Sequence, residues 1–258
     1  MNIGELYREL EKRIPSSLSC AWDNDGLLCC PDRNRTVKKI LVTLDVTAQA
    51  VEFALDGGYD CIISHHPFIF KGINSLTDEA PISAKAIKLI GAGVSVMSFH
   101  TRLDALEGGV NDTLCALLGI KDTEPLYEDG LPIGRVGTLD KSESAEEFAR
   151  RVKAVLSAPF VLLSDAGIDA RRVAVVGGSG KDMIALARAS GADTFLSGRF
   201  DYHYMTDALD DKSSPMNLLE AGHYWTEAPI CDMLAGMLKE IAPDVCCDIY
   251  ASNVIKAI

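Results

Sequence analysis

The stretch that decides the fold is residues 38–64, which read KKILVTLDVTAQAVEFALDGGYDCIIS. Two short apolar runs, KKILVTLD and YDCIIS, flank a segment whose apolar side chains recur at helical spacing. Thr47 is placed to cap this helix at its start, and Gly57 and Gly58 are placed to end it. The order of strand, helix and strand indicates two parallel strands joined by a crossover helix.

The same order continues along the chain. ISAKAIKLIGAG (82–93) predicts a second helix and VSVMSF (94–99) a third strand, so this part of the chain predicts an open sheet covered by helices. The stretch KDTEPLYEDGLP (121–132) follows soon after, and it is dense in acidic residues, proline and glycine. Such composition is typical of a boundary, and we expect one domain to end there.

A second set of alternating elements follows this stretch. Residues 144–156 predict a helix that opens with a capping box of Ser144 and Glu147. Strand and helix patterns then recur at residues 171–191, 194–198, 217–223 and 226–241. We therefore expect an α/β protein with two similar three-layer α/β domains. The first would comprise residues 1–124 and 228–258, and the second residues 125–227.

Composition and charge exclude some classes of protein. The chain has 258 residues and a net charge of −12, which opposes binding to a phosphate backbone and disfavours a nucleic-acid partner. The start, MNIGELYRELEKRIP, places charges between its apolar residues, so it predicts an amphipathic helix and not a signal peptide. No segment approaches the roughly 18 apolar residues that a membrane span requires.

The chain has eight cysteines, and none of them forms a C-x-x-C motif. Their scatter predicts reduced thiols that serve mainly in packing, as in a cytoplasmic protein, and neither a disulfide framework nor a thiolate zinc site. We therefore expect a cytoplasmic location.

All five histidines lie at or soon after the end of a predicted strand. They are His65, His66, His100, His203 and His223. In open α/β sheets, ligands bind beyond the carboxyl ends of the strands because loops from several strands converge there. The histidines are therefore candidates for one functional site, although any one of them alone would more often be a hydrogen-bonded side chain at a strand end.

Carboxylates accompany these histidines. Asp104 lies four residues after His100, Glu227 lies four residues after His223, and Asp45 ends the first strand. Imidazole and carboxylate ligands without thiolate suit zinc, iron, manganese or nickel better than calcium. Side chains of adjacent strand residues point to opposite faces, so His65 and His66 need either a turn at Pro67 or two ions.

Five motifs carry a resemblance to a known family. They are WDNDGLLC (22–29), ISHHPFIFKG (63–72), HTRLDALEGGVND (100–112), VAVVGGSGKD (173–182) and EAGHYWTE (220–227). Together they resemble the GTP cyclohydrolase I type 2 homologs, also called Nif-three-like dinuclear-metal hexameric proteins. The resemblance extends from near residue 3 to near residue 250 and implies two α/β domains, a dinuclear metal site in the cleft between them, and a homohexamer.

The resemblance also implies the residues of the site. By motif position, the ligands of two divalent ions would be His65, His66, Asp104, His223 and Glu227, with Asp104 or Glu227 as the bridging carboxylate. His100 and His203 would lie nearby as candidate catalytic proton shuttles. The implied activity is hydrolysis of a small molecule, such as a nucleotide or a pterin-like compound, by water that the ions activate. The alternatives are a non-catalytic metal-binding scaffold and a metal-trafficking protein.

Three features need separate interpretation. Arg102 stands where such proteins commonly have asparagine, and SGRFDYHY (197–204) replaces their Gly-Glu followed by a basic residue. GGSGK (177–181) lacks the first glycine and the final Ser/Thr of a phosphate-binding P-loop, so a simple tight turn is the better interpretation.

Overall fold

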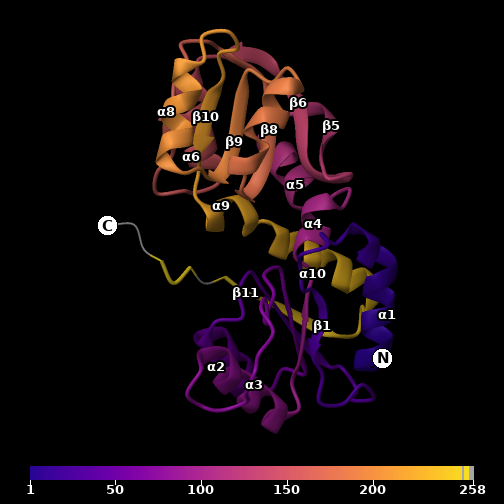
Figure 1. Ribbon diagram of the computed structural model, residues 1–258. Helices are drawn as coiled ribbons and strands as arrows, with labels where there is room; N and C mark the ends of the chain where they lie inside the picture. Colours follow the sequence, from indigo (N-terminus) through magenta and orange to yellow (C-terminus); the bar gives the residue numbers. More distant parts are fainter. Residues whose placement is uncertain (252, 256–258) are drawn as a thin grey trace. The chain divides into compact units, whose positions relative to one another are not determined.

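The computed structural model describes residues 1–251 and 253–255, and its contacts divide the chain into two units. Unit 1 comprises Met1–Leu103 and Ile230–Val254, and unit 2 is built on Asp104–Pro229. Each unit has its own β-sheet with helices packed against it (Figure 1). The structure thus confirms an α/β protein with two domains, and the chain leaves the first domain to form the second before it returns.

Unit 1 contains a five-stranded sheet in the order β1-β4-β3-β2-β11. Its strands are β1 (Gly26–Cys29), β2 (Lys39–Thr43), β3 (Cys61–Ser64), β4 (Ser95–Ser98) and β11 (Cys246–Tyr250). Its helices are α1 (Ile3–Arg13), η1 (Ser16–Leu18), α2 (Ala48–Asp56), α3 (Pro81–Ala92) and α10 (Ile230–Ile241). Four strands are parallel, and β1 is an antiparallel edge strand.

Local chemistry explains where the unit 1 helices begin and end. The Thr47 side chain accepts a hydrogen bond from the Ala50 amide at the start of α2, as the sequence predicts. Pro81 opens α3, where a missing amide hydrogen costs nothing, and Gly93 ends it in the left-handed conformation. Helices of defined length then pack against strands β2 and β3, whose residues are buried almost throughout.

The register of the parallel strands places their carboxyl ends at one edge of the unit 1 sheet. Thr43 of β2 pairs with Ser64 of β3, and Ser64 pairs with Ser98 of β4. The residues that follow these three positions therefore emerge side by side. This alignment decides which side chains meet in the candidate site.

Unit 2 contains a six-stranded sheet in the order β5-β6-β8-β9-β10-β7. Its strands are β5 (Lys121–Glu128), β6 (Leu131–Glu143), β7 (Leu162–Ser164), β8 (Ala170–Ser179), β9 (Thr194–Arg199) and β10 (Asn217–Glu220). Its helices are α5 (Val110–Leu117), α6 (Ala145–Val155), η2 (Lys181–Met183), α7 (Ile184–Ala189), α8 (Tyr202–Asp210) and α9 (His223–Glu227). Helix α4 (Thr101–Ala105) contains the point at which the chain passes from unit 1 to unit 2.

The centre of the unit 2 sheet is parallel and its edges are antiparallel. Strands β8, β9 and β10 are parallel, whereas β6 and β7 pair antiparallel with β8 and β10. Figure 1 shows β10, β9, β8, β6 and β5 side by side, with α8 beside β10. The predicted capping box of α6 is confirmed, because Ser144 and Glu147 each accept from the backbone amide of the other.

The acidic stretch at 121–132 belongs to a hairpin of this sheet. It forms β5 and the turn Asp129-Gly130, whose φ angles of 48° and 83° fit a type I′ turn. Pro125 is tolerated in β5 because an edge strand leaves one row of amides unpaired. The boundary expected at residue 124 thus falls within a strand, and the contacts divide the chain after Leu103 instead.

Helix length bears on membrane crossing. Among the residues that the structure describes, none of the helices combines the length and the apolar character needed to cross a bilayer.

Candidate metal centre

Histidines gather at the carboxyl edge of the unit 1 sheet. His65 and His66 directly follow β3, and His100 follows β4 by one intervening residue. Asp45 follows the neighbouring strand β2. The aligned register of these strands brings the four side chains to the same edge, as the sequence predicts.

The three imidazoles form one group. His65, His66 and His100 each offer a nitrogen that lies within 4.8 Å of those of the other two. The chain bends at His65 and His66, where their amides donate to the carbonyls of Thr43 and Leu44 at 3.3 and 2.9 Å. In a straight strand, the side chains of His65 and His66 would point to opposite faces of the sheet. Because the chain bends here, the two rings lie on the same side, with their centroids 4.9 Å apart.

Carboxylates hold two of these rings. Nδ1 of His66 lies 2.8 Å from an oxygen of Asp45, and Nδ1 of His100 lies 3.0 and 3.1 Å from the two oxygens of Asp23. A neutral imidazole that donates its Nδ1–H to a carboxylate presents the lone pair of Nε2 to a ligand. Both rings are therefore oriented as they would be in a carboxylate-histidine-metal arrangement.

Asp23 is a site residue that the sequence prediction missed. Its side chain is fully buried, and it also accepts hydrogen bonds from the amide and hydroxyl of Thr101 at 3.1 and 2.7 Å. Burial raises the pKa of Asp23, but the hydrogen bonds and charge of His100 and the bonds from Thr101 outweigh it and lower the pKa to about 2. Asp23 is thus held as a carboxylate at neutral pH.

Arg102 forms an ion pair with the loop that precedes β1, which also carries Asp23. Its guanidinium contacts Glu11 and donates to Asp25 at 2.8 Å, and the Arg102 and Asp25 side chains are only 5% and 3% exposed. Burial raises the pKa of Asp25 although Arg102 opposes the shift. Arginine at this position therefore joins α1 and the loop before β1 to the first residues of α4, which belong to unit 1.

In unit 2, His223 and Glu227 form a pair on helix α9. The two residues occupy positions i and i+4, and Nε2 of His223 lies 3.0 Å from Oε2 of Glu227. Asp104 also belongs to unit 2, and one of its carboxylate oxygens lies within 4.8 Å of one of Glu227. This unit thus brings together two buried carboxylates and an imidazole.

Two glycines leave the space that the side chains of Glu227 and Thr226 occupy. A Cβ added at Gly178 would lie 2.1 Å from Oε1 of Glu227, and one at Gly198 would lie 2.5 Å from Oγ1 of Thr226. The Gly178 amide donates to that hydroxyl at 3.1 Å, and Gly178 has a φ of +63°. Residues 177–179 of the GGSGK motif end strand β8, where the register against β9 shifts between Val176 and Ser179. The motif is therefore an irregular strand end and not a simple tight turn, and the absence of a Cβ at Gly178 lets its backbone approach Glu227.

Asn111 links the backbone of Asp104 to that of Gly177, the residue before Gly178. The Asn111 side chain donates to the backbone carbonyl of Asp104 at 3.0 Å and accepts from the amide of Gly177 at 2.8 Å. The side chain is fully buried, so these bonds fix the end of α4 against β8.

His203 is not a member of either group. It is the second residue of α8, a helix that the sequence analysis did not predict, and its ring packs against Tyr204 with centroids 4.4 Å apart. Among the described residues, His203 belongs to none of the groups that could hold a metal ion. Its catalytic role stays a prediction.

The donors in these groups fit a borderline divalent metal. They are imidazole nitrogens and carboxylate oxygens that converge within 4.8 Å, and no cysteine takes part. Zinc, iron, manganese and nickel accept such mixed ligands. The structure thus contains groups that could bind metal, in agreement with the prediction.

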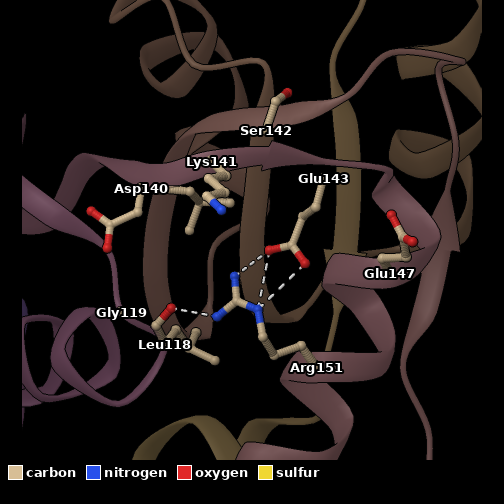
Figure 2. A pocket seen from close by; sticks show the side chains of 9 residues that line it. Leu118, Gly119, Asp140, Lys141, Ser142, Glu143, Glu147 and Arg151 are labelled. Carbon is tan, nitrogen blue, oxygen red and sulfur yellow. Dashed lines mark hydrogen bonds and ion pairs between the residues drawn. The ribbon is translucent and has the colours of Figure 1, made fainter.

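A separate hollow of about 600 Å³ lies beside α6 in unit 2 (Figure 2). The guanidinium of Arg151, which lines the hollow, pairs with Glu143 and donates to the carbonyl of Leu118 at 2.5 Å. The other charged residues that line the hollow are Asp140, Lys141 and Glu147, and no histidine lines it. Its chemistry does not resemble that of the histidine groups.

Comparison with known proteins gives one family. The model of the Duf34/NIF3 family (NGG1p interacting factor 3) matches residues 1–257. A Clostridium perfringens protein named GTP cyclohydrolase 1 type 2 homolog is 31% identical over 246 residues, which cover 93% of this chain and 92% of the relative. The Saccharomyces cerevisiae NGG1-interacting factor 3 is 29% identical and covers 94% and 92%.

Solved structures have the same fold. The crystal structure of Staphylococcus aureus protein SA1388 matches with a TM-score of 0.88 at 27% identity, over 100% of this chain and 99% of that one. Reduced HcgD from Methanocaldococcus jannaschii matches with a TM-score of 0.83 at 27% identity, over 96% and 97% of the two chains.

Proposed function

The chain belongs to the Duf34/NIF3 family, and on that premise we propose that it is a hydrolase that depends on two divalent metal ions per chain. The proposed ligands are His65, His66, Asp104, His223 and Glu227. The substrate would be a small molecule with a nucleotide or pterin-like ring, and the assembly a homohexamer in the cytoplasm. The names of the relatives support the substrate class, and eight cysteines that form no disulfide support the location.

The observation that carries the proposal is the group of three imidazoles in unit 1. Their nitrogens converge within 4.8 Å, and buried or half-buried carboxylates orient two of the rings. Outer carboxylates of this kind fix the tautomer of metal-binding histidines and raise their basicity. A purely structural role would not require three imidazoles to face one another.

The chain's own residues suggest how a proton is moved. A bound divalent ion supplies Lewis acidity, which can lower the pKa of water from 15.7 to about 7. Asp23 keeps a proton on Nδ1 of His100, so Nε2 of His100 is the atom that accepts a proton from the attacking water. The same atom can return that proton to the leaving group.

Metal content tests the first part of the proposal. We expect about two ions per chain after reconstitution with zinc, and less in His66→Ala and in Glu227→Ala. His203→Ala is the matched control, because His203 lies outside the ligand groups and its loss should leave metal content unchanged. Elemental analysis that finds less than half an ion per chain, or equal content in all the variants, contradicts the proposal.

Turnover tests the second part. A panel of nucleotides, pterins and phosphoesters should include one that the metal-loaded protein hydrolyses between pH 6 and 9. His100→Ala should lower this turnover roughly 10²- to 10⁴-fold with metal retained if His100 moves a proton. Metal loss in parallel with activity would make His100 a ligand instead.

Two alternatives remain as outcomes of these experiments. Full metal content without turnover favours a non-catalytic metal-binding scaffold. Rapid exchange of the bound metal with a chelator, again without turnover, favours a metal-trafficking protein. Light scattering that finds a monomer at micromolar concentration contradicts the proposed hexamer.

A further inference from the structure

Two exposed aromatic rings stand beside the histidine group of unit 1. Trp22 is 65% exposed and Phe70 is 45% exposed, although both are large and apolar. The centroid of Trp22 lies 6.2 Å from that of Phe70 and 6.1 Å from that of His100. Phe70 lies 6.2 Å from His100, so the three rings form one cluster with edge-to-face contacts.

The turn that carries Trp22 is held firmly. The Asp23 amide donates to the carbonyl of Cys20 at 3.0 Å, and the Cys20 amide donates to Oγ1 of Thr101 at 3.0 Å. The buried Asp23 carboxylate, next in sequence to Trp22, is fixed by Thr101 and His100. The exposure of Trp22 is therefore a property of an ordered turn.

The loop that carries Phe70 is tied to the same turn. The side chain of Asn24 donates to the carbonyl of Ile69 at 2.5 Å, and Phe68 anchors the loop in the core. One hydrogen bond thus joins the two segments that present the rings. Holding exposed apolar rings in fixed positions costs solvation, and such a surface is typical of a binding site.

From this cluster we propose that Trp22 and Phe70 form a stacking site for a planar heteroaromatic ring, such as a purine or a pterin. Flat ligands match aromatic side chains because every heteroaromatic ring has a π face that can stack on them. His100 borders both rings, so a stacked ligand would lie next to the proton-accepting imidazole. This inference rests on the proposed function and assigns its ring-binding residues.

Phe53 provides a matched control within the same unit. It is 44% exposed, almost equal to Phe70, and it also contacts two aromatic rings. Its neighbours are Tyr59 and Tyr250, not histidines. A general loss of exposed aromatic surface would therefore affect Phe53→Leu and Phe70→Leu equally.

Fluorescence of Trp22 provides a direct readout. The chain has two tryptophans, so Trp225→Phe leaves Trp22 as the one indole and keeps an aromatic ring beside Phe160. Guanosine, adenosine and pterin should be titrated into this variant, with ribose 5-phosphate as the control without a ring. We expect saturable quenching by at least one ring compound and none by ribose 5-phosphate.

The Phe70→Leu substitution should weaken ring binding by roughly 5- to 100-fold, and Phe53→Leu should leave it unchanged. Calorimetry with Trp22→Leu should show a loss of similar size. Absence of quenching by all three ring compounds, or equal effects of the two phenylalanine substitutions, overturns the inference. Trp22 emission that acrylamide cannot quench also overturns it, because a second copy of the chain then covers the rings.

Titrations with and without zinc separate this inference from the proposed function. Ring binding without metal-dependent turnover supports the stacking site and contradicts the hydrolase. Two bound ions without ring binding overturn the stacking site and leave the metal centre intact.

Discussion

The two units hold their candidate ligands by different means. In unit 1, carboxylate side chains hold the imidazoles, as Asp45 holds His66 and Asp23 holds His100. In unit 2, the backbone at Gly178 leaves the space that the Glu227 side chain occupies. A candidate ligand is thus held in place either by a charged partner, as in unit 1, or by a neighbouring glycine that has no Cβ, as in unit 2. The two kinds of support should fail in different ways.

The largest expected effect tests the charged support of unit 1. Arg102→Leu leaves Asp25 buried without its cation, which should lower the free energy of unfolding by about 3–5 kcal/mol. Arg150→Leu in unit 2 removes a cation from a pair whose side chains are exposed, and it should cost less than about 0.5 kcal/mol. Urea unfolding measures both values.

The same variant has a defined pH dependence. Burial already raises the pKa of Asp25, and loss of Arg102 should raise it further. Protonation removes the buried charge, so the defect of Arg102→Leu should shrink as pH falls toward that pKa. A defect that stays constant or grows with acid would show that Asp25 does not depend on Arg102.

The second effect tests the backbone support of unit 2. Gly178→Ala and Gly167→Ala both place alanine at a positive φ, which costs roughly 1–2 kcal/mol in each. Gly178 alone has Glu227 in the path of the new Cβ, whereas Gly167 faces open space. We therefore expect an additional loss of stability and of bound zinc only in Gly178→Ala. Equal unfolding midpoints and equal zinc content in the two variants would show that Glu227 does not depend on the space at Gly178.

A third effect concerns metal affinity. Asp45→Asn removes the charge behind the proposed ligand His66 and should weaken zinc binding about 10- to 100-fold, with a smaller change in stability. Asp23→Asn removes the charge behind His100, which is not among the proposed ligands, and should change zinc affinity little. Asp56→Asn, at the exposed end of α2, is the control for the loss of one negative charge. Competition with a zinc chelator measures the affinities. If Asp45→Asn binds zinc as tightly as Asp56→Asn, Asp45 does not support the imidazole of His66.

The smallest effect should be alike in the two units. Asn2 and Ser144 each form a complete capping box, at the starts of α1 and α6. Asn2→Ala and Ser144→Ala should therefore each cost about 1 kcal/mol in thermal or urea unfolding. A large difference between them would mean that the units respond unequally even to the same local change, and the other comparisons would need to be corrected for it.

The histidine group of unit 1 could be predicted because strand order and strand ends are local properties of a sequence. His65, His66 and His100 follow parallel strands, and parallel strands end at one edge. Asp23 could not be found in this way because it precedes β1, an antiparallel strand whose place beside β4 no local pattern specifies. Its position in the WDNDG motif was the available signal.

Other elements were missed for related reasons. Helix α8 begins at Tyr202 with Asp201 as its N-cap, but its short pattern of apolar residues was not recognised as a helix. The stretch at 121–132 has the composition of a linker, and only its pairing with β6 makes it a strand. Likewise, the need for glycine at position 178 depends on Glu227, a residue far along the chain.

The place of β11 in the first sheet affects how the protein can be synthesised. This strand pairs with β2, yet the whole of unit 2 lies between the two strands in the sequence. A ribosome adds roughly 5–20 residues per second, so the nascent β2 waits on the order of ten seconds for its neighbour. During that time its edge is open to pairing with another chain. The inserted unit 2, whose strands are all made by then, can fold first and hold the growing chain in a compact state.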